Sequence, residues 1–146
     1  MEKTNEEGIA VFGIINLGGE SDDKILLVHD KDKPVKPMYK CPGGRRDNNE
    51  TPEQTLYREV LKEEVKGLKI RSVSRQPFFE KKLNGHKIIF FTVVADSSSN
   101  VKPGEEIGEI IICSPDEITL LIAENRVLPT HAEALIKYLQ ECCIPY

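Results

Sequence analysis

Hydrophobic positions along the chain follow two patterns that predict different elements. Continuous apolar runs rich in β-branched and aromatic residues predict strands, and spacings of three and four residues after a capping signal predict helices. The predicted strands span residues 8–17, 24–29, 38–41, 68–83 with a break at Pro77, 86–96 and 110–113. The predicted helices follow Thr51, Ser114 and Thr130. With no long linker between them, these elements predict one domain over residues 1–146, of the α/β or α+β class.

The helix after Thr51 has the best-defined start. Thr51 is a favourable N-cap, Pro52 suits the first helical position, and Gln54 completes a capping box. A fixed start allows side-chain directions to be counted at about 100° per residue. The count places four apolar side chains in one arc: Leu56, Tyr57, Val60 and Leu61. It places Glu59 and Glu63 together at the edge of this arc, one turn apart.

Two carboxylates at this spacing can be interpreted in two ways. They repel each other, and a pair beside an apolar face suits a hard divalent cation, which prefers oxygen ligands. The same spacing also occurs on a solvated acidic face that carries no chemistry. The choice between these interpretations depends on the residues around the pair.

The segment from Gly43 to Leu68 resembles the signature of the Nudix hydrolase family. That signature reads Gly, five residues, Glu, seven residues, Arg-Glu-U-x-Glu-Glu-x-Gly-U, where U is a bulky aliphatic residue. The positions that fit it are Gly44, Glu50, Arg58, Glu59, Val60 and Glu63. Lys62 stands where the first glutamate of the pair belongs, and Val65 stands where the glycine belongs. The resemblance is therefore specific but imperfect.

The departure at Lys62 can be accommodated in two ways. In a regular helix, Glu59 and Glu63 stay on the metal-facing side and Lys62 replaces one ligand by a positive charge; this is the arrangement that we expect. The alternative is a π-bulge between Glu59 and Glu63, which brings Glu63 and Glu64 to the places of the family's glutamates. Such bulges are rare but concentrate at functional sites.

The resemblance implies an α/β/α sandwich with a mixed β-sheet and the activity of a metal-dependent hydrolase. Family members hydrolyse a nucleoside diphosphate linked to another group, by attack of water on phosphorus. Mg²⁺ or Mn²⁺ would be bound by Glu59, Glu63 and Gly44, with Glu64 added in the bulged register. Either Glu59 or Glu63 would orient or deprotonate the attacking water.

The resemblance also implies roles for flanking residues. Arg45 and Arg46 would contact the phosphates of a small nucleotide substrate, and Glu50 and Arg58 would brace the signature helix. A further carboxylate would come from one of Glu105, Glu106 and Glu109. Lys62 and the displaced glycine leave open a degenerate domain that binds a nucleotide or a partner without turnover. Because dimers are common in the family, a homodimer is a further expectation.

Charge and cysteine content narrow the possible partners. The net charge of −4 supplies no basic stripe for duplex nucleic acid. The sequence contains neither an apolar run near 18 residues nor the pattern of a signal peptide at its start, so we expect a cytoplasmic protein that does not bind membranes. Cys41, Cys113, Cys142 and Cys143 lack the spacing of a zinc site and are expected to be free thiols. His131 is expected to be a polar residue in the first turn of the last helix.

Overall fold

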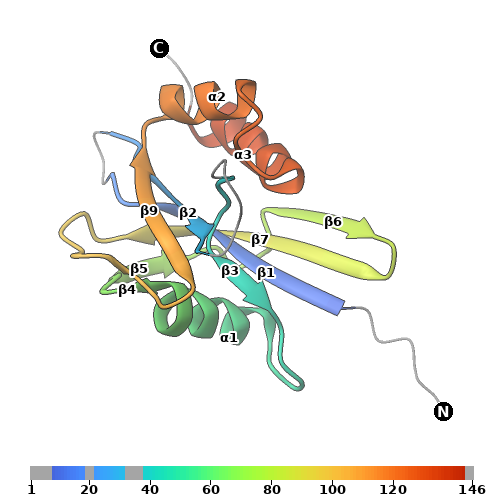
Figure 1. Ribbon diagram of the computed structural model, residues 1–146. Coiled ribbons are helices and arrows are strands. Elements are labelled where there is room, and N and C mark those ends of the chain that lie inside the picture. The colour runs from blue at the N-terminus through green and yellow to red at the C-terminus, as the bar shows by residue number, and fades with distance from the viewer. Residues whose placement is uncertain (1–7, 19–21, 32–37, 144–146) are drawn as a thin grey trace.

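The computed structural model describes residues 8–18, 22–31 and 38–143, and its centre is a mixed sheet with helices on both faces (Figure 1). The strands of this sheet are β1 (Gly8–Asn16), β2 (Ile25–Asp30), β3 (Gly43–Arg45), β5 (Ile70–Val73), β6 (Phe79–Leu83), β7 (His86–Ala95) and β9 (Ile107–Cys113). Two short strands, β4 (Val65–Lys66) and β8 (Lys102–Pro103), pair separately. The helices are α1 (Pro52–Tyr57), the π-helix η1 (Arg58–Glu64), α2 (Pro115–Ala123) and α3 (Pro129–Cys142).

The strands of the large sheet follow the order β5-β7-β1-β2-β9, with β6 added beside β7 and β3 beside β1. Among the strand pairs of the described residues in this sheet, β1 and β7 are parallel and the other pairs are antiparallel. One edge of β1 pairs with β7 over nine residues, and the other edge is shared by β3 and β2. The segment that leads into β3 therefore runs between β1 and β2, where Lys40 bridges to Val28 and the Pro42 carbonyl accepts from Gly13 N–H at 2.9 Å.

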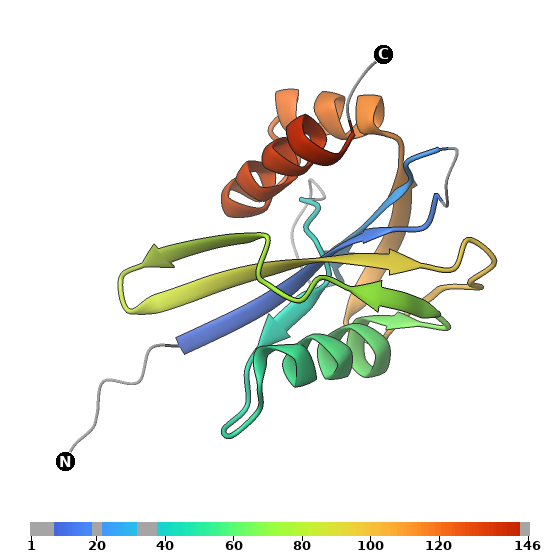
Figure 2. The same ribbon diagram turned by 180° about the vertical axis from the view of Figure 1, so that it is seen from behind.

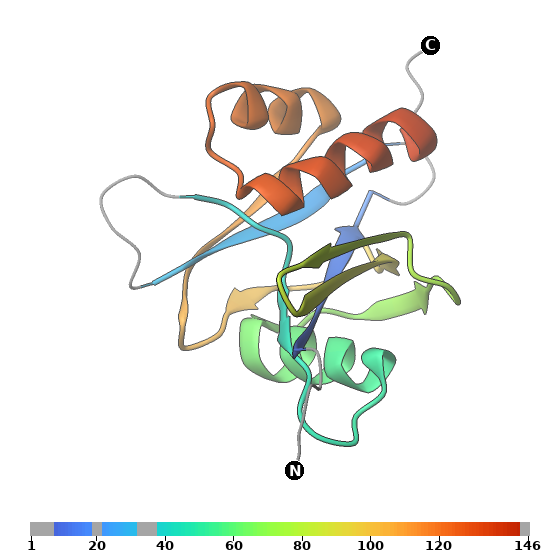
Figure 3. The ribbon, with the colours of Figure 1, turned by 90° about the vertical axis from the view of Figure 1, so that its right-hand side faces the viewer.

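The two faces of the sheet carry separate hydrophobic cores. Leu56 of α1 and Val60 of η1 are fully buried with Val11 and Phe91 on one face. On the other face, α2 and α3 cover the strand residues whose side chains point away from the first core. Ile118 of α2 and Leu135 of α3 are buried there with Ile14 of β1 and Phe90 of β7. Figures 2 and 3 show α1 with η1 on one side of the sheet and α2 with α3 on the other. The sandwich with a mixed sheet expected from the sequence is confirmed.

The capping signals predict two helix starts correctly and one incorrectly. Thr51 and Ser114 both form complete capping boxes, with Gln54 and Glu117 respectively. The box expected at Thr130 is wrong: α3 begins at Pro129 after Leu128, without a side-chain cap. A backbone bond fixes the chain just before the helix, since Leu128 N–H donates to the Tyr39 carbonyl at 3.0 Å.

The expected regular helix through Glu59 and Glu63 is also wrong. From Arg58 to Glu64 the backbone forms a π-helix, which ends with Val65 N–H donating to the Val60 carbonyl five residues earlier. In a regular helix the side chain of Glu64 would point into the apolar arc. The wider turn lets Val65 enter the core, where it is fully buried, and directs Glu64 towards Gly43 N–H instead.

His131 is buried, contrary to the expectation of an ordinary polar residue. Its side chain packs edge-on against Phe12 and Phe90, and its Nδ1 accepts from Cys41 N–H at 3.1 Å. Burial lowers the pKa of His131 to about 3, so the ring is neutral near pH 7. The ring therefore fastens α3 to the segment that enters β3.

Two further features concern the cysteines and the length of the apolar helices. The four cysteines are free. Within residues 8–18, 22–31 and 38–143, the structure has no helix that is both long and apolar enough to cross a membrane.

Candidate active site

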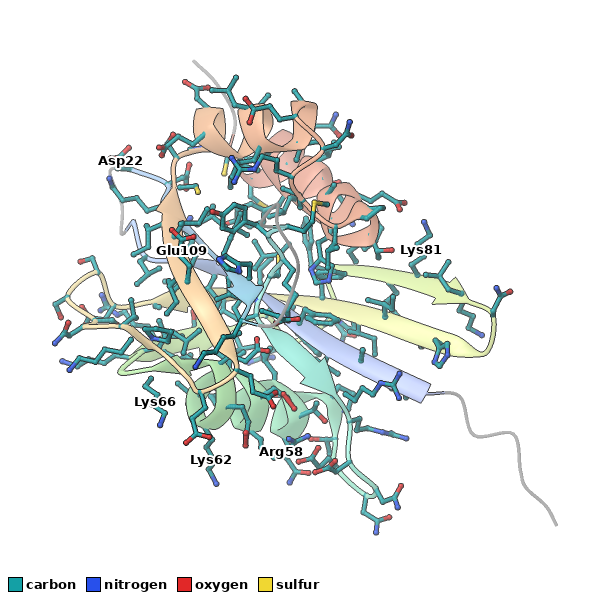
Figure 4. The ribbon with its side chains drawn as sticks, viewed as in Figure 1. Asp22, Arg58, Lys62, Lys66, Lys81 and Glu109 are labelled. Carbon is teal, nitrogen blue, oxygen red and sulfur yellow. The ribbon has the colours of Figure 1, made fainter. Side chains whose placement is uncertain are left out.

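A pocket of about 410 Å³ lies where the end of η1 meets the turn between β8 and β9. Its lining is made of charged side chains: Glu59, Lys62, Glu63, Glu64, Lys66, Glu105 and Glu106. We call it the carboxylate pocket. In Figure 4 the labelled side chains of Lys62 and Lys66 extend outwards from η1 and β4, away from the sheet, and both residues are exposed. The pocket thus combines five carboxylates with two lysines.

Gly104 brings the turn with Glu105 and Glu106 to the pocket. Its N–H donates to the Glu64 carbonyl at 2.9 Å. A Cβ at this position would lie 2.8 Å from the carbonyl carbon of Glu63, and closer still to the carbonyl oxygen, well inside ordinary contact. Only glycine allows the two backbones to approach this closely. The sequence offered a signal for this contact, since Gly104 directly precedes the two glutamates.

Glu59 lies against the backbone of β3. A Cβ at Gly44 would fall 2.8 Å from Glu59 Oε1 and closer to its other carboxylate atoms, so any larger residue here would push the Glu59 carboxylate out of its present position. Arg58 Nη1 donates to Glu59 Oε1 at 3.0 Å. The Glu59 side chain is 18% exposed, which leaves part of its carboxylate accessible from the pocket.

Arg58 connects the loop before α1, β3 and η1. Its guanidinium bonds Glu50 in a bidentate manner, with Nε to Oε2 at 2.7 Å and Nη2 to Oε1 at 3.0 Å. Nη2 also donates to the Arg45 carbonyl at 2.9 Å. Arg58, together with the N–H of Asp47, holds the pKa of Glu50 at about 2. These contacts fix the position from which η1 begins.

Glu64 is the least exposed of the pocket carboxylates, and both of its oxygens have partners. Oε1 accepts from Gly43 N–H at 2.9 Å, and Oε2 accepts from Lys40 Nζ at 3.4 Å. Burial raises the pKa of Glu64, while Lys40 and the Gly43 N–H act in the opposite direction. The sequence pattern does not indicate that Lys40 contacts Glu64. Its position just before Cys41-Pro42-Gly43 is the one feature that places it near the signature.

Three of the residues singled out from the sequence lie outside the carboxylate pocket. Arg45 is exposed at the end of β3 and lines a smaller pocket of about 170 Å³ at the start of β1 and β7. Arg46 donates its backbone N–H to the Ile9 carbonyl at 2.8 Å. Glu109, labelled in Figure 4, lies further along β9, and its Oε1 is 3.1 Å from Tyr39 OH and 3.2 Å from His29 Nε2. Of the three candidate glutamates in this region, Glu105 and Glu106 line the pocket.

The donor set of the pocket suits a hard divalent cation. Mg²⁺ and Mn²⁺ prefer carboxylate and carbonyl oxygens, which this lining supplies from η1, the β8–β9 turn and the adjoining β3 backbone. In the part of the chain that the structure describes, no group of three or more acidic, histidine or cysteine side chains is arranged closely enough to hold a metal ion. The chemistry of the lining therefore fits a metal, and part of that lining is engaged in contacts within the protein.

Comparison with known proteins gives matches at the levels of family, sequence and structure. A family model described as the NUDIX domain matches residues 6–137. The ADP-ribose pyrophosphatase of Methanocaldococcus jannaschii is 32% identical over 104 residues, which are 69% of this chain and 58% of that protein. The chain thus spans less than two thirds of this relative's length.

Solved structures share the fold at low sequence identity. A NUDIX hydrolase from Nitrosomonas europaea superposes with a TM-score of 0.73 at 22% identity, covering 94% of this chain and 73% of that one. An Ap4A hydrolase from C. elegans gives a TM-score of 0.67 at 15% identity, covering 90% and 96%. The family model spans most of the chain and the fold agrees with these structures, so the chain belongs to the NUDIX domain family.

Proposed function

We propose that this protein is a metal-dependent hydrolase of a nucleoside diphosphate linked to another group. The observation that carries the proposal is the carboxylate pocket, in which glutamates of η1 face Glu105 and Glu106. The family membership and the fold support the same reaction class. Attack of water on phosphorus depends mainly on charge neutralisation and alignment, and a site rich in carboxylates supplies these through a bound cation.

The proposed roles follow from where each side chain lies. Glu59, Glu63 and the backbone of Gly44 would hold Mg²⁺ or Mn²⁺, and the π-helix adds Glu64 to the same pocket. The bound ion would neutralise charge on the diphosphate oxygens. Glu63 is exposed, so its carboxylate can reach a water molecule and either orient it or accept its proton. Glu59 is the other candidate for this role.

Residues around the pocket would assist binding. Glu105 and Glu106 share the pocket, and we propose that one of them supplies the further carboxylate. Arg45 and Arg46 come directly after the Gly44 backbone, and a guanidinium suits phosphate oxygens. We propose that they contact the phosphate furthest from the metal. Glu50 and Arg58 would act indirectly, by bracing the start of η1.

ADP-ribose is the first substrate to test, because the sequence relative is named as an ADP-ribose pyrophosphatase. The assay would incubate metal-stripped protein with ADP-ribose, nucleoside triphosphates, NADH or dinucleoside polyphosphates, each with Mg²⁺ or Mn²⁺. Products would be measured as phosphate released after pyrophosphatase treatment for the nucleoside triphosphates and after phosphatase treatment for the other substrates. We expect turnover of at least one substrate, with a loss of about 100-fold or more in the Glu59→Gln and Glu63→Gln variants.

A matched control distinguishes the loss of a pocket carboxylate from the loss of a glutamate elsewhere on the helical segment. Glu53→Gln makes the same substitution on an exposed residue of α1 that does not line the carboxylate pocket, and it should leave turnover unchanged. Lys62, a cation among the glutamates that line the carboxylate pocket, favours a second candidate function: binding without turnover. Nucleotide binding with no hydrolysis of any substrate would support this alternative and contradict the proposed activity.

A further inference from the structure

Lys40 is a buried cation that the proposed reaction does not use. Its side chain is 11% exposed, and its backbone N–H and carbonyl are both bonded to Val28 of β2. Its Nζ lies 3.4 Å from Glu64 Oε2 and 5.3 Å from the centre of the Phe12 ring. The lysine therefore approaches Glu64 from the side of the sheet, with its backbone bonded to β2.

Glu64 differs in this respect from its neighbour Glu63. The Glu64 side chain is 13% exposed, and its two oxygens accept from Gly43 N–H and from Lys40. The Glu63 side chain has no hydrogen bond or ion pair to another described residue, and it is exposed. A cation that enters the pocket thus meets one carboxylate that is free to turn and another that is already neutralised.

We infer that Lys40 is an internal counter-ion of Glu64, which a divalent cation must displace before this carboxylate can act as a ligand. This inference rests on the proposed function, because it requires that a divalent ion binds in the carboxylate pocket. An ammonium and a metal ion repel each other at a few ångströms, and the repulsion is weakly screened between groups with so little exposure. Separating the buried pair also leaves Lys40 without its partner. Lys40 therefore lowers the metal affinity of the site.

The test is a titration of metal-free protein with Mn²⁺, with free Mn²⁺ measured by electron paramagnetic resonance. We expect Lys40→Met and Lys40→Gln to bind Mn²⁺ about tenfold more tightly than the wild type, because a poorly screened positive charge is removed. The second variant keeps polarity, and it carries the test if the methionine variant does not fold. Lys40→Arg keeps the charge and should retain an affinity close to that of the wild type.

Two further variants show whether the effect passes through Glu64. Lys66→Met removes the same charge from an exposed position in the same pocket, and it should change affinity by less than about twofold because exposed charges are screened. The double variant Lys40→Met/Glu64→Gln should lose the gain seen with Lys40→Met. In EDTA, Lys40→Met should unfold at a lower temperature than the wild type, and Mn²⁺ should restore more stability to it than to the wild type.

The outcomes distinguish the two proposals. If the wild type binds Mn²⁺ and the Lys40 variants bind it equally well, the counter-ion role is wrong and the proposed function stands. A gain that persists in the double variant would also overturn the inference, because it would come from net charge alone. If neither the wild type nor any variant binds Mn²⁺, the metal dependence in the proposed function is wrong and the inference falls with it.

Discussion

Replacing Gly104 by alanine should both destabilise the protein and disturb the carboxylate pocket. The added Cβ would lie 2.8 Å from the carbonyl carbon of Glu63, whereas ordinary contacts begin at 3.4 Å, so the β8–β9 turn and η1 must separate. The separation also weakens the bond from Gly104 N–H to the Glu64 carbonyl, now 2.9 Å long. Overpacking costs about 1–3 kcal/mol and the lost hydrogen bond about 1 kcal/mol.

We therefore expect Gly104→Ala to reduce the free energy of unfolding by about 2–4 kcal/mol, which corresponds to a fall of about 6–12 °C in Tm. Glu105 and Glu106 move with the turn. A displacement of roughly 1 Å in groups that position a reacting centre can lower the rate about 100-fold. Urea unfolding would measure the free energy of unfolding. The same preparation would be used to measure Mn²⁺ affinity, and kcat/KM on a substrate that the assay of nucleotides described above shows to be hydrolysed.

Gly85→Ala provides the control for stability alone. Gly85 has a φ of +81° in the β6–β7 hairpin and no atom within 4 Å of the position of a Cβ, so alanine there costs about 1–2 kcal/mol of backbone strain. This turn lies away from the pocket lining, so metal affinity and kcat/KM should stay at wild-type values. The reasoning is refuted if Gly104→Ala loses the expected stability and still binds Mn²⁺ and turns over substrate like the wild type.

Three further predictions concern the parts that support the site. Arg58 makes the largest contribution to lowering the pKa of Glu50 to about 2, with the N–H of Asp47 acting in the same direction, so the stabilisation is complete above pH 4.5 and is lost as the pH falls towards 2. Arg58→Met should therefore reduce this pH dependence, as measured by urea unfolding at several pH values. His131 has a pKa of about 3 when folded and 6.5 when unfolded, so stability should fall by about 1.4 kcal/mol per pH unit below 6.5. His131→Gln should be less stable at pH 7 but lack this slope, and an unchanged slope in calorimetry would contradict the buried neutral ring. Leu56 is fully buried and Tyr57 is 40% exposed, so Leu56→Ala should cost about 2–5 kcal/mol and Tyr57→Ala about 1 kcal/mol in urea unfolding; equal losses would refute the packing of α1.

Local signals predicted most of the elements. The Asn84-Gly85 pair, a strong hairpin signal in the sequence, joins β6 to β7 with both residues at positive φ, because a two-residue hairpin needs that conformation. Thr51 and Ser114 cap their helices because each finds its partner three residues away in the chain. These features depend on neighbours in the sequence, and a pattern of residues is sufficient to find them.

Errors occurred where a distant segment decided the outcome. Tyr57 was placed in the apolar arc from its helical direction, yet it is exposed, because the core on that side is filled by Leu56 and Val60. The sequence predicts His131 as a polar residue of the first helical turn, but Cys41 N–H and the aromatic rings of the sheet enclose it. Neither partner is close in sequence, so no local pattern indicates the contact.

The sequence by itself determined the family signature, the start of the helix that carries it, and the presence of Glu59 and Glu63 on that helix, because short-range capping and spacing fix all three. The tertiary structure decided the rest of the site. Bonds from Gly43 and Gly104 to Glu64, and the burial of Val65, stabilise a π-helix over the regular one that local spacing favours. The same packing brings Glu105, Glu106 and Lys40 to the pocket, since contacts between segments far apart in the chain depend on how the sheet and helices assemble.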